Sequence, residues 1–269
     1  ACAQAGLDAA AVVFEAACFG MSGGPEDKEA ILAGILRTGR LIVTNDAVIA
    51  LAGATANGQG IVTIAGTGSI AFGRNGEGRS AGGRSVGGRG AGGRSAGAGS
   101  ARAGGWGYVF GDEGGAFDIV RQAVRAALRM EEGWGPSTSL RQVLLDATGS
   151  RSANEMLHRF YTAEWPRSRV ATLARLVDAA ALEADGVAAG ILAAAAQELA
   201  MLAGAVRGQL WKPGDPVELA YIGGVFESRL LLERFRMLVE LDEATRCLPP
   251  RRGPAEGALL EAYRAAGNA

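Results

Sequence analysis

The chain has 269 residues, enough for one large domain or two medium ones, and its content of 48% hydrophobic and 20% charged residues excludes a disordered chain. A formal net charge of −1 provides no general basic field, so we expect neither nucleic acid nor a membrane as a partner. The three cysteines are scattered and there is one histidine, which argues against a disulfide framework, an iron–sulfur cluster, a multi-histidine metal site and a Ser-His-Asp triad. This cysteine usage fits a reducing cytoplasm.

The first part of the chain alternates between strand and helix patterns. The apolar run Val12–Phe19 predicts a buried strand, and Pro25 with the carboxylates after it predicts a helix that continues to about Arg37. Leu41–Thr44 then predicts a short strand and Ala47–Thr55 a helix. This alternation predicts an α/β fold with a parallel or mixed sheet.

The stretch Ile61–Gly73 predicts a β-hairpin, because two apolar, strand-forming runs flank the turn Gly66-Thr67-Gly68-Ser69. The two glycines let a ligand approach the main-chain N–H groups, and the hydroxyls of Thr67 and Ser69 add donors. Such a turn can cradle a phosphate or a sugar oxygen, although an ordinary tight turn has the same pattern.

A repeat follows the hairpin. From Gly78 to Gly97 the sequence consists of four pentapeptides, GRSAG, GRSVG, GRGAG and GRSAG. These residues can bury little apolar area, so we expect a disordered surface loop. Nucleic-acid binding, as in Arg-Gly segments, is the alternative.

The segment Trp106–Val120 places Asp112 and Glu113 between glycines, directly before an expected helix from Ala116 to Met130. Carboxylates at a helix start are often only caps. A glycine-flanked acidic pair after an aromatic residue can also hydrogen-bond a polyol or a metal-bound water. From these residues alone both interpretations stay open.

The remaining chain predicts mainly helices. Residues 131–175 carry no clear chemical signal, and alanine-rich helices are expected over Ala179–Leu210. A strand over Val217–Ile222 runs into Gly223-Gly224 and a further helix, an arrangement compatible with nucleotide binding. A terminal helix is expected over Pro254–Ala266.

Six segments, taken in this order, resemble the N-acetylglucosamine kinase branch of the BadF/BadG/BcrA/BcrD ATPase family, within the sugar kinase, Hsp70 and actin superfamily. They are GMSGG (20–24), TNDA (44–47), IVTIAGTGSIAFG (61–73), GGWGYVFGDEGGAFDI (104–119), AYIGGVFES (220–228) and PAEGALLEAYRAA (254–266). The resemblance implies an α/β, two-lobed, actin-like ATPase (RNase H-like) fold with ATP between the lobes. One lobe would comprise residues 1–57 with a returning helix in 251–269; the other would comprise residues 58–250, with the repeat inserted at about 78–103.

The resemblance also implies the site of an aminosugar kinase that uses ATP and Mg²⁺. Asp46 would be the general base that takes the proton from the sugar hydroxyl; the alternative, from its position alone, is that it only caps a helix. The residues expected to contact the sugar are Ser22, Asn45, Thr67, Gly105, Trp106 and Asp112. Those expected to contact the nucleotide are Gly66, Thr67, Gly68, Ser69, Gly223, Gly224 and Glu227.

The sequence departs from the family pattern in two places. The family's opening Asp-Gly-Gly-Gly-Thr phosphate loop does not occur, and Ala3–Ala11 resembles the end of a helix. We therefore expect a truncated first lobe with an unpaired sheet edge, and weak or absent kinase activity. The pentapeptide repeat is the second departure.

Two alternative functions stay open. One is an ATPase that activates a 2-hydroxyacyl-CoA dehydratase, although the cysteines are not placed to bridge its iron–sulfur cluster. The other is a non-catalytic protein that binds a sugar or a nucleotide. The resemblance also makes a homodimer possible.

Overall fold

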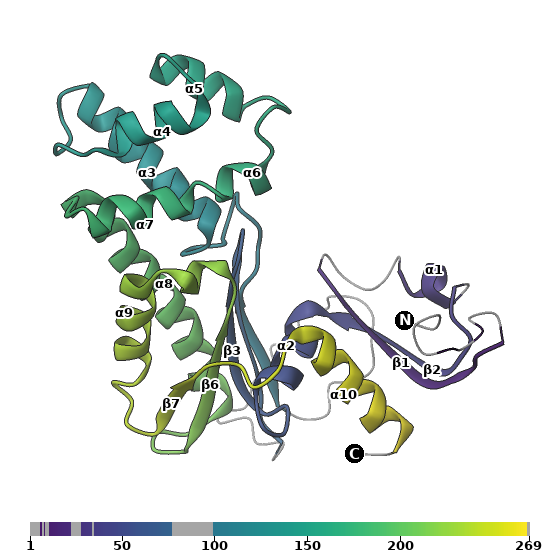
Figure 1. Ribbon diagram of the computed structural model, residues 1–269. Helices are drawn as coiled ribbons and strands as arrows, with labels where there is room; N and C mark the ends of the chain where they lie inside the picture. The colour runs from purple at the N-terminus through teal and green to yellow at the C-terminus, as the bar shows by residue number, and fades with distance from the viewer. Residues whose placement is uncertain are drawn as a thin grey trace.

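The computed structural model describes residues 6, 8, 11–22, 28–33, 35–76 and 99–267 (Figure 1). Most of the helix end expected over Ala3–Ala11, the helix start expected at Pro25 and the glycine repeat lie outside these residues. A larger part, built on a five-stranded sheet, stands beside a smaller part with a two-stranded sheet (Figure 1).

The larger sheet is mixed. Its central strand β3 (Gly60–Ala65) pairs antiparallel with β4 (Ser69–Arg74) and parallel with β6 (Val217–Ile222). The edge strands are β5 (Ser100–Gly104), antiparallel to β4, and β7 (Thr245–Leu248), parallel to β6. The predicted hairpin, the β6 strand and the mixed sheet are confirmed. The two edge strands were not expected, because SARAG and TRCL are short and become strands only beside their neighbours.

Helices cover both faces of this sheet. On one face Ile61 and Ala65 belong to the main core; on the other, Val62 packs with Leu51 and Ala54 of α2 (Asp46–Ala54). Because side chains alternate along a strand, burial on both faces explains the nearly continuous apolar sequence of β3. The helices of the main core are α3 (Ala116–Glu131), α7 (Ala174–Leu182), α8 (Gly186–Leu210) and α9 (Arg229–Val239).

Within the described residues, α8 is long and apolar enough to cross a membrane when length and composition alone are considered. Core helices of soluble proteins meet the same criterion. Here Leu192, Leu199 and Val206 are buried in the main core, and the helix packs against α9, β4 and β5. Packing inside the protein thus accounts for this row of apolar residues along α8.

Three short helices lie between α3 and α7 in the sequence and form one end of the molecule (Figure 1). They are α4 (Leu140–Thr148), α5 (Ala153–Phe160) and α6 (Arg167–Ala171). Leu140, Leu144 and Trp165 anchor this helical insertion in the main core. Helices this short have weak periodicity and depend on tertiary packing, which is why this part of the sequence carried no clear signal.

The smaller part contains a parallel pair, β1 (Phe14–Met21) and β2 (Thr38–Asn45), with α1 (Glu29–Ala33) between them in the sequence. The prediction of a helix that continues to Arg37 is wrong, because among the described residues α1 ends at Ala33. The carbonyl oxygen of Arg37 instead accepts a hydrogen bond from the Phe14 N–H at 3.0 Å. Pairing with β1 thus makes β2 begin at Thr38, before the predicted start.

The terminal helix α10 (Pro254–Ala266) has the predicted bounds and lies between the larger sheet and the β1–β2 pair (Figure 1). It packs closely on α2: a Cβ on Gly257 would lie 2.6 Å from the backbone nitrogen of Gly53. Its Glu261 accepts from Arg74 of β4 at 3.0 Å and from Arg264 at 2.7 Å. The helix therefore joins β4 and α2 through one carboxylate and one close backbone contact.

Candidate active site

The turn between β3 and β4 carries two unpaired main-chain donors. Gly66 N–H donates to the Gly68 carbonyl at 2.9 Å, which closes the turn. Within the described part of the chain, the N–H groups of Thr67 and Gly68 have no acceptor, and both residues are partly exposed. Successive free N–H groups form a concave site suited to a phosphate oxygen.

The start of α3 holds this turn in place. The N–H groups of Ala116 and Phe117 donate to the carbonyls of Gly66 and Thr67 at 2.8 and 3.1 Å. The Ser69 hydroxyl donates to the Glu113 carbonyl at 2.6 Å, so it serves the internal structure of the site. The turn is therefore rigid, and its free donors come from the backbone of Thr67 and Gly68.

Asp112 lies directly against the turn. Its carboxylate carbon would be 2.5 Å from a Cβ on Gly68, so only glycine fits there without a shift. Asp112 is 5% exposed and has a backbone φ of 63°, in the left-handed region that few side chains adopt. Its Oδ2 pairs with Nη2 of Arg167 at 3.3 Å. A nearly buried carboxylate is thus placed beside the free N–H groups.

Gly105 and Trp106 follow β5 at the same place. The Gly105 N–H donates to the Ser69 carbonyl at 2.9 Å, which sets the loop beside the turn. Trp106 is 68% exposed, with the guanidinium of Arg102 4.6 Å from its ring centroid. An exposed aromatic face is suited to bind the apolar face of a sugar ring.

The second glycine turn lies next to the first. Ile64 of β3 is in register with Ile222 of β6, so the residues after both strands are neighbours. Gly223 has a φ of 119°, and a Cβ there would lie 2.5 Å from the carbonyl carbon of Ala65. Gly224 and Glu227 are exposed in the short 3₁₀ helix η2 (Gly224–Glu227). Both turns therefore open at the carboxyl edge of parallel strands, where α/β proteins bind ligands.

Ser22, which follows β1, and Asn45, the last residue of β2, lie close to Asp46, the first residue of α2. Met21 is in register with Asn45, so Ser22 follows β1 where Asp46 follows β2. Asp46 is exposed, and its Oδ1 accepts the N–H of Ala47 at 2.8 Å. Asp46 is thus the first residue of α2 and bonds the N–H of the next residue, while the N-cap is Asn45, whose side chain makes no capping bond. Oδ2 of Asp46 has no hydrogen-bond partner among the described residues.

The direction of α2 decides which end of the larger sheet Asp46 approaches. Thr55, at the end of α2, lies 3.4 Å from a Cβ placed on Gly60, the first residue of β3. With Leu51 and Ala54 packed on Val62, α2 runs antiparallel to β3. Asp46 therefore lies toward the end of β3 that leads into the turn at Gly66–Ser69. No hydrogen bond or ion pair joins Asp46 to this turn within the described residues.

Further carboxylates, those of Glu113, Asp118 and Glu198, lie near the loop that carries Asp112. Asp118 accepts from the Gly114 N–H at 3.1 Å and pairs with Arg121 at 2.6 Å. Burial raises the pKa of Glu198, and the neighbouring carboxylates of Glu113 and Asp118 raise it further. The surroundings of the loop from Gly105 to Gly115 are therefore acidic. A positively charged side chain in this region offsets the repulsion between the carboxylates.

Sequence reasoning did not find Arg167, which lies in the stretch without a clear chemical signal. An arginine at the start of a short helix is common, and its contact with Asp112 exists only because the helical insertion folds back over α3. No pattern in the sequence joins these two residues.

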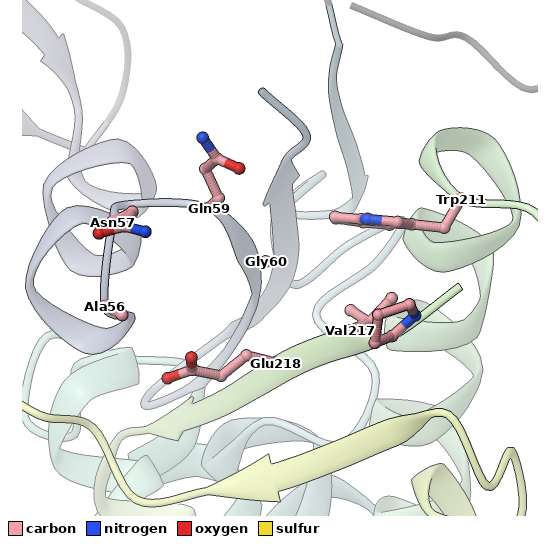
Figure 2. A pocket seen from close by; sticks show the side chains of 8 residues that line it. Ala56, Asn57, Gln59, Gly60, Trp211, Val217 and Glu218 are labelled. Atoms are coloured by element: carbon pink, nitrogen blue, oxygen red, sulfur yellow. The ribbon is translucent and has the colours of Figure 1, made fainter. Parts of the chain in front are cut away.

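A pocket of about 180 Å³ lies elsewhere, at the start of β3 and β6. Figure 2 shows Gln59, Trp211 and Glu218 around it. Gly60 and Val217 are the first residues of their strands, so this pocket opens at the end of the sheet opposite to the two glycine turns. It is separate from the candidate active site.

Two glycine turns at one sheet edge, with carboxylates beside them, are an arrangement with which α/β proteins can bind phosphate groups. A family model described as the BadF/BadG/BcrA/BcrD ATPase family matches residues 86–262. The chain belongs to this family, and its fold is the actin-like ATPase fold of its structural neighbours.

Named relatives agree with this assignment. An N-acetylmuramic acid/N-acetylglucosamine kinase of Clostridium acetobutylicum is 34% identical over 234 residues, 84% of this chain and 70% of the relative. An N-acetyl-D-glucosamine kinase of Dictyostelium discoideum is 30% identical over 226 residues, 80% of this chain and 64% of the relative. A crystal structure from Chromobacterium violaceum, solved as a candidate N-acetylglucosamine kinase, has a TM-score of 0.73 at 25% identity and covers 97% of this chain and 80% of that one.

Proposed function

We propose that this protein is an ATP-dependent kinase that transfers the γ-phosphate of ATP to a hydroxyl of an aminosugar, N-acetylglucosamine or a close relative. The observation that carries the proposal is the pair of free N–H groups at Thr67 and Gly68 beside the carboxylate of Asp112. The relatives from Clostridium acetobutylicum and Dictyostelium discoideum are named as kinases of this class of sugar.

The nucleotide would lie along the two glycine turns. The free N–H groups of Thr67 and Gly68 would neutralise phosphate oxygens, and Gly223 with Gly224 would let the nucleotide approach the backbone. Mg²⁺ would enter with ATP, since phosphate oxygens supply many of its ligands in kinases. The described residues contain no cluster of three or more His, Cys, Asp or Glu side chains suited to a metal ion.

The sugar would lie between Asp112 and Asp46. Asp112 would accept hydrogen bonds from its hydroxyls, and Trp106 would cover one face of the ring. Asp46 would accept the proton of the attacking hydroxyl on Oδ2, while its Oδ1 stays bonded to the first turn of α2. Ser22 and Asn45, beside Asp46, would contribute further polar contacts.

The two parts of the chain would act as the two lobes of the kinase. Residues 1–57 with the helix in 251–269 would carry Asp46, and residues 58–250 would carry the glycine turns. Closure of the lobes would bring the acceptor hydroxyl to the γ-phosphate.

Calorimetry and product analysis test the function. We expect N-acetylglucosamine, glucosamine or N-acetylmuramic acid to bind, ADP release to depend on the sugar, and ³¹P NMR to show a sugar phosphate. Glucose, which lacks the amino substituent, is the matched control ligand. Absence of sugar binding, or ATP hydrolysis that does not depend on sugar, would contradict the proposal. Binding without a phosphorylated product would restrict the protein to sugar recognition.

A further inference from the structure

Arg167 links the helical insertion to the candidate site. It is the first residue of α6, and its Nη2 lies 3.3 Å from Oδ2 of Asp112. The Asp112 side chain is 7% exposed, whereas that of Arg167 is 36% exposed. Among the residues that the structure describes, no other cation pairs with Asp112. Burying a carboxylate without a charged partner costs free energy, so we expect this ion pair to stabilise the observed position of Asp112.

Arg167 also contacts Tyr108, which lies four residues before Asp112. Its guanidinium carbon lies 5.2 Å from the ring centroid of Tyr108, and that ring packs edge-on against Phe117 at 5.4 Å. The carbonyl of Tyr108 accepts a hydrogen bond from Arg121 at 3.1 Å. The guanidinium of Arg167 thus contacts two residues of the loop before α3, the ring of Tyr108 and the carboxylate of Asp112.

The conformation of Asp112 needs such support. Its φ of 63° is unfavourable for a residue with a side chain and persists only where the surroundings enforce it. Arg167 engages Oδ2 of this carboxylate. The ion pair therefore engages one oxygen and leaves the second, Oδ1, without an ion-pair partner among the described residues.

We propose that Arg167 is a positioning residue, which fixes the Asp112 carboxylate against the Gly66–Ser69 turn so that its second oxygen can bind a sugar hydroxyl. The sugar-binding part of this inference rests on the proposed function. Arg167 acts through Asp112, and α6 thereby sets the affinity for the sugar while leaving the affinity for ATP unchanged.

Kinetics of three variants test the sugar-binding part. Arg167→Met, which keeps an unbranched apolar stem and removes the charge, is expected to raise the sugar KM or Kd about 10- to 100-fold and to leave the KM for ATP within about twofold. Arg167→Lys should recover part of the affinity, because it keeps the charge and loses the planar fork. Arg169→Met is the matched control: this arginine lies on the same helix, stacks on Trp165 at 4.1 Å and should leave the sugar KM unchanged.

A double-mutant cycle separates positioning from direct binding. If Arg167 acts through Asp112, the variant with both Arg167→Met and Asp112→Asn binds sugar no more weakly than Asp112→Asn alone. Additive losses would overturn the proposal and make Arg167 a direct ligand of the substrate.

Hydrogen exchange of the ligand-free protein tests positioning without any sugar. Arg167→Met is expected to speed amide exchange in Gly111–Gly115, whereas Arg169→Met is not. Unchanged exchange in Arg167→Met overturns the positioning role, whatever the sugar assays show. If the wild-type protein binds no sugar, the proposed function fails, and the exchange result still decides the role of Arg167.

Discussion

Gly68 and Asp112 occupy adjoining space so closely that a methyl group on the glycine would meet the carboxylate carbon at 2.5 Å. The contact joins the turn after β3 to the loop before α3, two segments with the glycine repeat between them in the sequence. It places a nearly buried negative charge beside two free N–H groups. This juxtaposition underlies the proposed sugar and phosphate sites.

Replacing Gly68 tests this contact directly. Gly68→Ala is expected to displace Asp112, to lower the free energy of unfolding by about 1–3 kcal/mol and to weaken sugar and ATP binding together. Gly66→Ala in the same turn is the control, because a Cβ there meets no atom within 4 Å and its φ is not positive. Urea unfolding and calorimetry measure both effects. Equal losses in the two variants would show that the contact is not what restricts position 68.

The carboxylate of Asp46 is the group expected to accept the proton. Asp46→Asn keeps the shape and the hydrogen bond to the first turn of α2, so folding should be little affected. We expect kcat to fall about 10²–10⁴-fold, with sugar affinity nearly unchanged. Asp146→Asn, on the exposed surface of α4, should keep full activity in the same coupled assay. A kcat close to that of the wild type in Asp46→Asn would leave only the structural role at the start of α2.

The crossing of α2 and α10 should tolerate no side chain. In Gly257→Ala the new Cβ would lie 2.6 Å from the backbone nitrogen of Gly53, and backbone cannot move as a flexible side chain can. We expect a loss of about 1–3 kcal/mol in the free energy of unfolding. Gly204→Ala in α8 meets no atom within 4 Å and should instead stabilise the protein by up to about 1 kcal/mol. Thermal and urea unfolding of the two variants should therefore shift in opposite directions.

Acid should weaken the start of α8 through Asp185. Burial alone would raise the pKa of this carboxyl, but hydrogen bonds from the Ala188 N–H, the Thr138 hydroxyl and Ser139 outweigh it and lower the pKa from 3.8 to about 2. Because the value in the folded state lies below the ordinary one, the stabilisation is present above about pH 4 and is lost as the pH falls through about 2.

The lowered pKa of Asp185 predicts how variants of this site respond to acid. Between pH 5 and pH 2 the free energy of unfolding should fall less steeply in Asp185→Asn than in the wild type. Thr138→Val, which removes a bond of 2.7 Å, should give an intermediate slope. Denaturant titrations across this pH range measure the slopes, and identical slopes in all three proteins would contradict the assignment.

Several elements were predictable because their signals are local. β6 and α10 have the predicted bounds, since a short apolar run before glycines and a proline at a helix start act within a few residues. α1 and β2 were misjudged at their boundary, where pairing between Phe14 and Arg37 overrides helix propensity. The edge strands and α4–α6 were missed because their sequences are short and ambiguous without neighbours.

By itself the sequence determined the α/β class and the hairpin with its glycine turn, because glycine, proline and apolar periodicity constrain the backbone locally. The family, and the candidate residues that stay predictions, followed from the resemblance of six segments. Only the tertiary structure decided which residues meet: Gly68 with Asp112, Gly223 with Ala65, and Arg167 with Asp112. These contacts join segments that are far apart in the chain. They depend on how the sheet and helices pack as a whole, and no local pattern of residues encodes that packing.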